Sequence, residues 1–491
     1  MKRMMMLCLS LLFFLSMTAC IEVDIPNELM PTPTPTESPS PSPTETPSPT
    51  KTPTPTPTHD GIPDELPVDM PITLNLYTGF GGGANAYATQ DIIDSFNEMY
   101  PMVNIILNNE GNYANLRDIV TVFIDRGTVP ALIMGYPDHY AEYIAVDALV
   151  PFDSYMNHPI HGLDDLDDFI SAFLAENQQF EYTYSLPIMK STQLVAYNKT
   201  LFDAHGITFD YDEVVTWDRL HNEIAPIVVG NGANQCENLL LIGSSANAFI
   251  NFVHQWGIGY TNQEGRIHFV EDREATTAMF ADLIEMFEAR TIVSTRAEWN
   301  DQYGSTRFRN GDACMIDASS AGIRFNIPSG ANAFEVGFIP AIQKHATPEE
   351  GPMSVVQQGP NIAIGADTND YERLAAWLFI RHATNAENSA HIAVAAQYLP
   401  VRYSSYDTDI WQDFITSTDP DEQYFIQGTK TAMAQEAWYN YDDAFIAHPR
   451  DPDLGNHSSS RVRRISGLGF EDLWLTRDPD DTFDWLESEL D

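Results

Sequence analysis

The stretch ITLNLYTGFGGGAN, residues 72–85, gives the strongest indication of fold class. Residues 72–77 alternate apolar and polar side chains with a period of two, which predicts a β-strand. The glycines within residues 79–83 predict a loop that opens a helix. Apolar residues at 92, 93 and 96 share one face of that helix, and Pro101 stops it. The stretch therefore begins a strand–helix unit.

The same order repeats further along the chain. Residues 103–107 predict a strand, and apolar residues between 116 and 124 have the spacing of one helix face until Gly127 ends that helix. Residues 131–134 predict a third strand. Successive units of this kind predict a parallel sheet with helices on both faces. Similar patterns follow at 194–197, 217–229, 279–289 and 371–383, so we expect an α/β protein with two lobes.

Residues 1–19 have the composition of a secretory signal peptide, with Lys2 and Arg3 before an apolar core that is too short to span a bilayer. The sequence Met-Thr-Ala-Cys that ends at Cys20 resembles a bacterial lipobox, which implies that Cys20 is lipidated. Residues 31–58 are almost entirely Pro, Thr and Ser, a composition that favours an extended stalk. We therefore expect residues 20–70 to be a lipidated N-terminus and linker at the outer face of the cell membrane.

Composition excludes several classes of function. The chain has 491 residues and 43% hydrophobic content, enough for more than one domain. The net charge of -45 argues against binding to nucleic acid, whose phosphates require a basic surface. No calcium-loop or Cys/His spacing predicts a metal site, and no cofactor is expected. Cys236 and Cys314 either form a disulfide or remain buried thiols.

Two enzyme classes compete with a binding function. Residues 79–84 match G-x-G-x-x-A, a dinucleotide fingerprint, but no acidic residue follows at a strand end about 20 positions on. A glycoside hydrolase remains the alternative from another class, because its two carboxylates need no local motif. The richness in Tyr, Trp, Asn, Gln and Ser near predicted strand ends instead suits capture of a sugar or polyol by hydrogen bonds and ring stacking.

Ten short segments, in order along the chain, carry a resemblance to one known family. They are Phe96-Asn97-Glu98-x-Tyr100-Pro101, Gly111-Asn112-Tyr113, Gly127-Thr128-x-Pro130-Ala131, Leu186-Pro187-x-x-Lys190-Ser191-Thr192, Tyr197-Asn198-Lys199-x-x-Phe202, Thr216-Trp217, Asn310-Gly311-Asp312-Ala313-Cys314-Met315, Ala318-Ser319-Ser320, Gln358-Gly359-Pro360-Asn361 and Tyr398-Leu399-Pro400-Val401. On these segments the chain resembles, from residue 72 to residue 474, the family 1 extracellular solute-binding proteins of ABC importers, a family with maltose- and glycerol-3-phosphate-binding members.

The resemblance implies the type II periplasmic-binding-protein fold, with two α/β lobes and a ligand cleft between them. We expect residues 71–184 and 318–357 in lobe one, and residues 185–317 and 358–491 in lobe two. The implied function is capture of a carbohydrate by a monomer and its delivery to an ABC permease in the cytoplasmic membrane, without catalysis.

The resemblance also implies the ligand contacts. Motifs of the glycerol-3-phosphate-binding branch place ligand-binding residues at Tyr113, Asp138, Ser191, Ser319, Gly359 and Tyr398. Where that branch has a phosphate-binding Arg before Leu-Gly-Asn, this chain has Asp453, with Arg450 nearby. An Asp would repel a phosphate, so we expect a neutral sugar or oligosaccharide. Glycerol 3-phosphate or a glycerophosphodiester is the alternative within the family.

Overall fold

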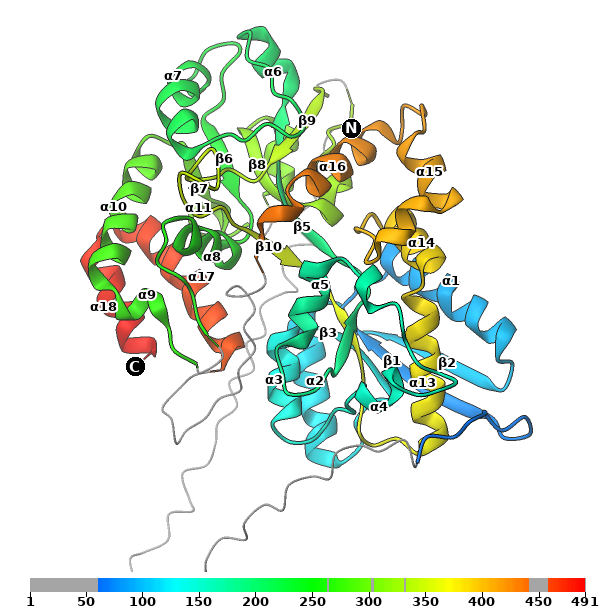
Figure 1. Cartoon of the computed structure of the whole chain (residues 1–491). Coiled ribbons are helices and arrows are strands. Elements are labelled where there is room, and N and C mark those ends of the chain that lie inside the picture. The colour runs from blue at the N-terminus through cyan, green and yellow to red at the C-terminus, as the bar shows by residue number, and fades with distance from the viewer. Residues whose placement is uncertain (1–60, 263–264, 302–303, 331–332, 441–457, 491) are drawn as a thin grey trace, which may run out of the picture. The chain divides into compact units, whose positions relative to one another are not determined.

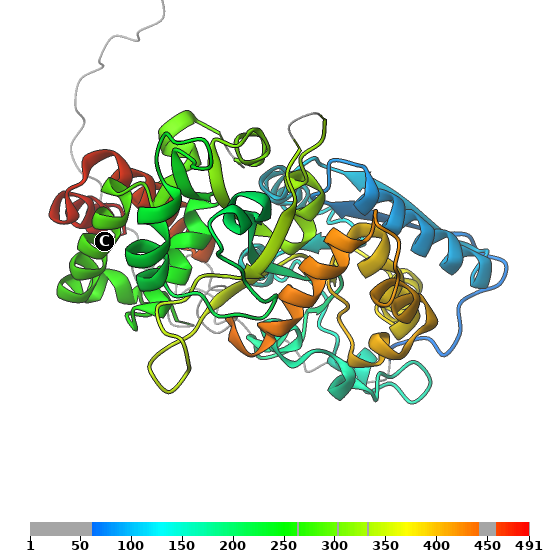
Figure 2. The ribbon, with the colours of Figure 1, turned by 90° about the horizontal axis from the view of Figure 1, so that it is seen from above.

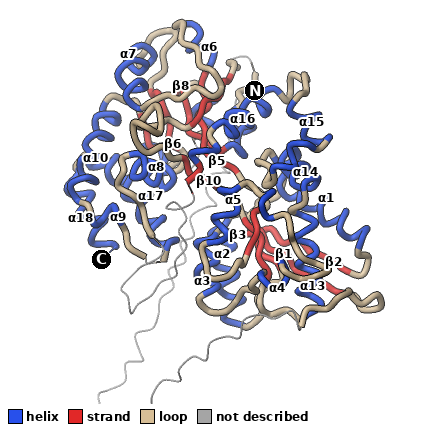
Figure 3. Tube along the Cα trace, viewed as in Figure 1, coloured by secondary structure: helices blue, strands red, loops and turns tan. Residues whose placement is uncertain are grey.

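A computed structural model describes residues 61–262, 265–301, 304–330, 333–440 and 458–490, which fall within the compact unit Thr56–Asp491. The predicted signal peptide, Cys20 and the Pro/Thr/Ser-rich stalk lie outside the described residues, as do Arg450 and Asp453. The strands form two separate groups with helices around each, and the two groups are the sheets of the two lobes (Figures 1 and 3).

The sheet of lobe one has five strands in the order β2-β1-β3-β11-β4. Their bounds are β1 (Ile72–Thr78), β2 (Val103–Asn109), β3 (Leu132–Gly135), β4 (Ser185–Pro187) and β11 (Asn361–Ile364). β1 pairs in parallel with β2 and β3, which confirms the predicted strand–helix units. β11 is antiparallel to both β3 and β4.

Helices cover both faces of this sheet. Side chains alternate between the faces, so Leu132 and Met134 pack in one apolar cluster while Ile133 packs in another. The helices of lobe one are α1 (Ala84–Met99), α2 (Tyr113–Arg126), α3 (Pro137–Ile144), α4 (Asp153–Met156), α5 (Ser171–Ala175), α13 (Asp370–Ala383), α14 (Ala386–Ala396) and α15 (Asp409–Ile415).

Local signals fix the ends of α2. The side chain of Asn112 accepts a hydrogen bond from the backbone N–H of Asn115, which satisfies one free donor of the first turn. Gly127 ends the helix with φ 64°, the left-handed conformation that glycine adopts most easily. The predicted stop at Gly127 is confirmed.

The second sheet has the order β12-β10-β5-β8-β6-β7, and β9 also pairs with β5. Its strands are β5 (Ser191–Asn198), β6 (Asn238–Ile242), β7 (Ile292–Ser294), β8 (Ala313–Ser319), β9 (Val336–Pro340), β10 (Val355–Gln358) and β12 (Tyr439–Asn440).

Lobe two adds its own helices to this sheet. They are α6 (Lys199–Ala204), α7 (Ala225–Val228), α8 (Ser245–Gln255), α9 (His268–Glu271), α10 (Arg273–Glu288), α11 (Thr295–Trp299), α12 (Ser305–Asn310), α16 (Gln423–Ala434), α17 (Ser459–Thr476) and α18 (Pro479–Leu490), with the 3-10 helix η4 (Ser320–Asn326) after β8. Figure 2 shows the C-terminal helices, in red, next to the green helices of this lobe.

The strand pairing differs from the predicted lobe boundaries. β9 and all of β10 except its last residue lie in 318–357, which we expected in lobe one, yet both strands pair with β5 of the second sheet. β11 lies in 358–491, which we expected in lobe two, yet it pairs with strands of the first sheet. The chain therefore crosses between the lobes at 188–190, at 359–360 and again between α15 and α16.

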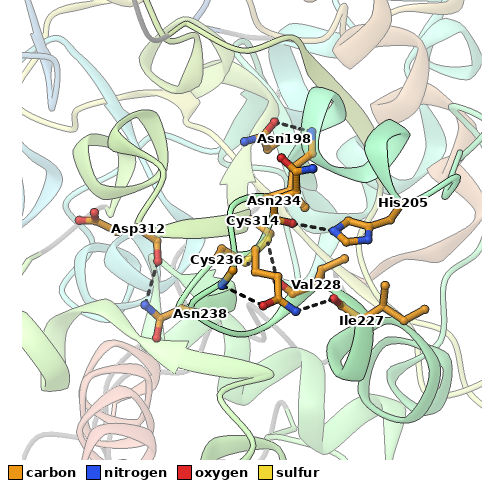
Figure 4. Close-up of a disulfide and its surroundings, with 12 residues drawn as sticks. Asn198, His205, Ile227, Val228, Asn234, Cys236, Asn238, Asp312 and Cys314 are labelled. Carbon is orange, nitrogen blue, oxygen red and sulfur yellow. Dashed lines mark hydrogen bonds between the residues drawn. A yellow bond between two sulfur atoms is a disulfide. The ribbon is translucent and has the colours of Figure 1, made fainter.

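Cys236 and Cys314 form a disulfide, with their Cα atoms 5.6 Å apart. The bond joins the segment before β6 to β8 within lobe two (Figure 4). A hydrogen bond also fixes the backbone at Cys236, because its N–H donates to the carbonyl of Val228 at 3.0 Å. The sequence permits either a disulfide or free thiols, and the structure selects the disulfide.

Candidate ligand-binding cleft

A cleft of about 1160 Å³ is lined by residues of both lobes. Lobe one contributes the glycine-rich loop after β1, the first turn of α2 and the turn into α3. Lobe two contributes the start of α8, the end of β8, η4 and α17. The volume exceeds the roughly 300–1,000 Å³ of an ordinary small-molecule site, so a ligand of more than one sugar ring fits.

Tyrosines form the lobe-one side of the cleft. The rings of Tyr113 and Tyr136 lie 4.3 Å apart between centroids, and the ring of Phe80 lies 6.4 Å from that of Tyr113. Tyr398 also lines the cleft, and its hydroxyl accepts a hydrogen bond of 3.2 Å from Asn85. Burial raises the pKa of Tyr398 to about 12 and that of Tyr113 well above its ordinary value. Both hydroxyls therefore stay protonated and can donate to a ligand oxygen.

The glycine loop makes room for Tyr113. A Cβ atom at Gly79 would lie 2.6 Å from a ring carbon of Tyr113, closer than side chains tolerate. Glycine at this position therefore lets the tyrosine ring lie directly against the end of β1. This packing gives the loop a role in shaping the cleft, in place of the phosphate binding of a dinucleotide fingerprint.

Asp138 lies in the first turn of α3, lines the cleft and is 4% exposed. Among the described residues its Oδ1 atom has no hydrogen-bond partner. Its neighbour His139 is also buried, and burial lowers the pKa of His139, which keeps the ring neutral. A buried carboxylate oxygen with unused acceptor capacity suits a ligand hydroxyl.

The two predicted serines differ in position. Ser319 lines the cleft at the end of β8, where its hydroxyl accepts the N–H of Ala321 at 3.3 Å. Ser191 is 3% exposed and is absent from the cleft wall; its hydroxyl lies 3.4 Å from that of Ser319. Ser191 therefore supports Ser319, and the structure does not place it in contact with the cleft.

Gly359 is also absent from the cleft wall. It lies at a crossing between the lobes with φ 99°, and an added Cβ would lie 1.9 Å from the carbonyl oxygen of Met189. The backbone of the other crossing segment therefore requires glycine here. The close approach that glycine permits here is made by the protein's own backbone, and contact of Gly359 with a ligand stays a prediction.

An ordered chain of hydrogen bonds ends in the cleft at Asp317. The N–H of Val356 donates to Asn251 Oδ1 at 2.9 Å, and Asn251 Nδ2 donates to Gln193 Oε1 at 2.7 Å. Gln193 Nε2 then donates to Asp317 Oδ2 at 2.8 Å. Because a backbone N–H can only donate, the orientation of both amides is fixed. Burial raises the pKa of Asp317 to about 7.

A family comparison identifies what kind of protein carries this cleft. The family model described as bacterial extracellular solute-binding protein matches residues 91–417, more than half of the chain. The chain belongs to this family. This membership confirms the predicted role in binding a solute outside the cytoplasm and agrees with the two-lobed fold.

Solved structures share the fold of this solute-binding protein. The GacH receptor of Streptomyces glaucescens, solved unliganded and with acarbose, is 16% identical with a TM-score of 0.65, covering 86% of this chain and 99% of that one. UgpB of Mycobacterium tuberculosis, solved with glycerophosphocholine, is 18% identical with a TM-score of 0.63, covering 85% and 96%. A solute-binding protein of Agrobacterium radiobacter K84, solved with ribitol, is 17% identical with a TM-score of 0.63, covering 86% and 98%.

Curated relatives match over a short segment. A protein named as a binding protein, from Brucella abortus (strain 2308), is 36% identical over 84 residues, which is 17% of this chain. A relative from Brucella suis biovar 1 (strain 1330) matches with the same identity over the same number of residues. The chain spans only 18% of the length of either relative.

The sequence did not reveal several residues that line the cleft of this solute-binding protein. Asp317, Gln193 and Asn247 were not proposed, although Asp317 lies two positions before Ser319 in the same strand and so shares its face. Six arginines were also missed, because they come from five separate elements and form no local motif.

Two absences hold within the described ranges. There, no three His, Cys, Asp or Glu side chains gather in a way that would hold a metal ion. None of the described helices is both long and apolar enough to cross a membrane.

Proposed function

We propose that the cleft binds a carbohydrate or sugar-like polyol for uptake by an ABC importer. The arrangement of Tyr113 and Tyr136, two rings in contact at the cleft wall, is the observation that carries this proposal. Aromatic faces accept the C–H surface of a sugar ring, while the side chains of Asn85, Asp138 and Ser319 offer hydrogen bonds to hydroxyls.

The ligands of proteins with the same fold support the proposal. The GacH receptor was solved with acarbose, UgpB with glycerophosphocholine and the Agrobacterium protein with ribitol. These three ligands all carry several polar oxygens. A cleft with many hydrogen-bonding side chains and aromatic rings in contact is suited to the same kind of molecule.

The proposed mechanism is capture followed by closure. A ligand that contacts both lobes stabilises the closed arrangement by its greater affinity for that state, and the permease then recognises the closed monomer. The chain would act at the outer face of the cell membrane, held by a lipid on Cys20 and raised by the Pro/Thr/Ser-rich segment. Exchange of Cys20 for Ser should release the protein from the membrane fraction.

Ligand-dependent thermal unfolding tests the proposal. The chain without residues 1–20 is screened against mono- and oligosaccharides, sugar alcohols and glycerophosphodiesters. A saturable rise in Tm that follows ligand concentration supports binding, because a ligand that binds only the folded state stabilises it by RT ln(1 + [L]/Kd). No shift with any compound of the panel would contradict a carbohydrate or polyol ligand.

A glycoside hydrolase would behave differently in the same experiment. Four acids line the cleft, namely Asp138, Asp301, Asp317 and Glu471, so a carboxylate pair has to be tested directly. Chromatography of each oligosaccharide after incubation distinguishes the two functions, because a binding protein leaves the substrate intact. Hydrolysis would be established if the parent protein produced shortened oligosaccharides and the Asp138→Asn or Asp317→Asn variant did not.

A further inference from the structure

Arginine is concentrated in the cleft although the chain is strongly acidic. Six of the 25 Lys and Arg residues line the cleft, in a chain whose net charge is -45. Arg117 belongs to lobe one; the other five, all from lobe two, are Arg296, Arg309, Arg324, Arg463 and Arg464. The lobe-one wall thus carries four Phe and Tyr rings and one arginine, whereas the lobe-two wall carries five arginines.

Some of these arginines already have acidic partners. Arg117 pairs with Asp118 at 2.8 Å, and Arg296 lies 3.4 Å from a carboxylate oxygen of Glu471. Asp118 therefore partly neutralises the charge of Arg117, and Glu471 partly neutralises that of Arg296.

Arg324 is the clearest case of an available cation. Its guanidinium carbon lies 4.8 Å from the ring centroid of Phe325, which is 53% exposed and also lines the cleft. Within the described part of the chain, no carboxylate lies within ion-pair distance of Arg324. Its charge acts on Tyr398, whose pKa it lowers against the larger effect of burial. Arg324 therefore carries a charge toward the cleft beside a residue we expect to contact the ligand.

Arg309 adds a second cation in the same wall. Its guanidinium donates to the hydroxyl of Thr306 at 3.3 Å, a neutral partner. Arg464 is exposed and, among the described residues, forms no ion pair. Guanidinium groups with neutral partners are suited to a bidentate bond with a carboxylate or phosphate.

We propose that the ligand carries a negatively charged group, a carboxylate or a phosphate, that binds the arginines of lobe two while its polyol part lies against the tyrosines of lobe one. This inference rests on the proposed function and names the class of ligand. It reverses the sequence-based expectation of a neutral sugar, which rested on Asp453, a residue outside the described ranges. A ligand that contacts both walls in this way also gives a reason for closure.

Isothermal titration with matched ligand pairs tests the inference. One arm compares oligogalacturonates with neutral galactose oligomers of the same length, and the other compares glycerol 3-phosphate and glycerophosphodiesters with glycerol. The charged member should bind at least about tenfold more tightly, since hydrogen bonds to charged groups contribute roughly 1.5–3 kcal/mol. Its affinity should also fall as salt concentration rises. The arm that binds identifies carboxylate or phosphate.

Arg324→Gln provides the matched variant, with Arg126→Gln at the exposed end of α2 as the control. Arg324→Gln should weaken the charged ligand about tenfold or more and the neutral ligand less than twofold, and Arg126→Gln should change neither. Equal binding of charged and neutral partners, or an equal loss of both in Arg324→Gln, would overturn the inference and leave the proposed function intact. Absence of binding by every compound would contradict both proposals.

Discussion

The ammonium of Lys190 lies 3.0 Å from each carboxylate oxygen of Glu176, and neither side chain is more than 2% exposed. The same ammonium donates to the carbonyl of Gly359 at 3.0 Å, and the carbonyl of Lys190 accepts the N–H of Leu399 at 2.7 Å. Lys190 therefore joins two crossing segments to each other and to the segment that carries Tyr398. A buried pair at this point fixes the pivot about which the lobes would move.

Exchange of Lys190 for Met should destabilise the protein strongly. The change leaves the carboxylate of Glu176 buried without its cation, and loss of one partner of a buried pair costs about 3–5 kcal/mol. The free energy of unfolding in urea measures the effect. Lys199→Met is the control, because Lys199 and Asp203 form an exposed i,i+4 pair whose loss costs only about 0.3–0.5 kcal/mol.

The double variant Lys190→Met with Glu176→Gln tests the reason for that loss. In Lys190→Met the negative charge of Glu176 is left unpaired, and Glu176→Gln removes that charge. The double variant should therefore be more stable than Lys190→Met alone. Equal stabilities of the single and double variants would show that packing, and not the charge of Glu176, determines the effect.

Exchange of Gly359 for Ala should disrupt the crossing. The new Cβ would lie 1.9 Å from a backbone oxygen of Met189, and φ at this position is 99°, so relief requires the backbone to move. We expect a loss of about 3 kcal/mol or more in the free energy of unfolding. Gly61→Ala is the matched control, because a Cβ there would meet no atom within 4 Å. A Gly359→Ala protein as stable as Gly61→Ala would refute the explanation.

Loss of the disulfide should also destabilise lobe two. Cys236 and Cys314 are 78 residues apart. In the entropic model, a cross-link that closes a loop of that length lowers the entropy of the unfolded chain and so stabilises the folded protein by roughly 4 kcal/mol. The Cys236→Ser, Cys314→Ser double variant should therefore unfold at lower urea concentration than the oxidised protein. Addition of reductant should lower the unfolding midpoint of the parent protein and leave that of the double variant unchanged.

The sequence predicts the strand–helix units well because each element carries its own periodicity and end signals. The strand at 103–107 and the helix that ends before Gly127 are confirmed for that reason. The placement of β9, β10 and β11 depends on pairing between distant strands, which no local pattern encodes. The predicted lobe boundaries were therefore wrong where the chain returns.

The candidate site shows the same division. Tyr113, Asp138, Ser319 and Tyr398 line the cleft, and their contact with a ligand stays a prediction. The sequence suggested a ligand contact at Gly359. The requirement for glycine there comes from Met189, 170 positions earlier in the chain, and no local pattern reveals that contact. Arg324 and the other arginines come together only in the folded lobe, so their common charge could not be recognised from the sequence.

Exchange of Asp317 for Asn should alter how stability depends on pH. Burial raises the pKa of Asp317 in the folded protein to about 7, above its ordinary 3.8, so the folded state holds a proton that the unfolded state releases. The penalty for ionising Asp317 is absent below about pH 4 and grows until about pH 7. The neutral amide of the Asp317→Asn variant avoids this penalty and can still accept the hydrogen bond of Gln193. The Tm of Asp317→Asn relative to the parent should therefore rise between pH 5 and pH 8, and a constant difference over that range would show that Asp317 is already ionised at pH 5.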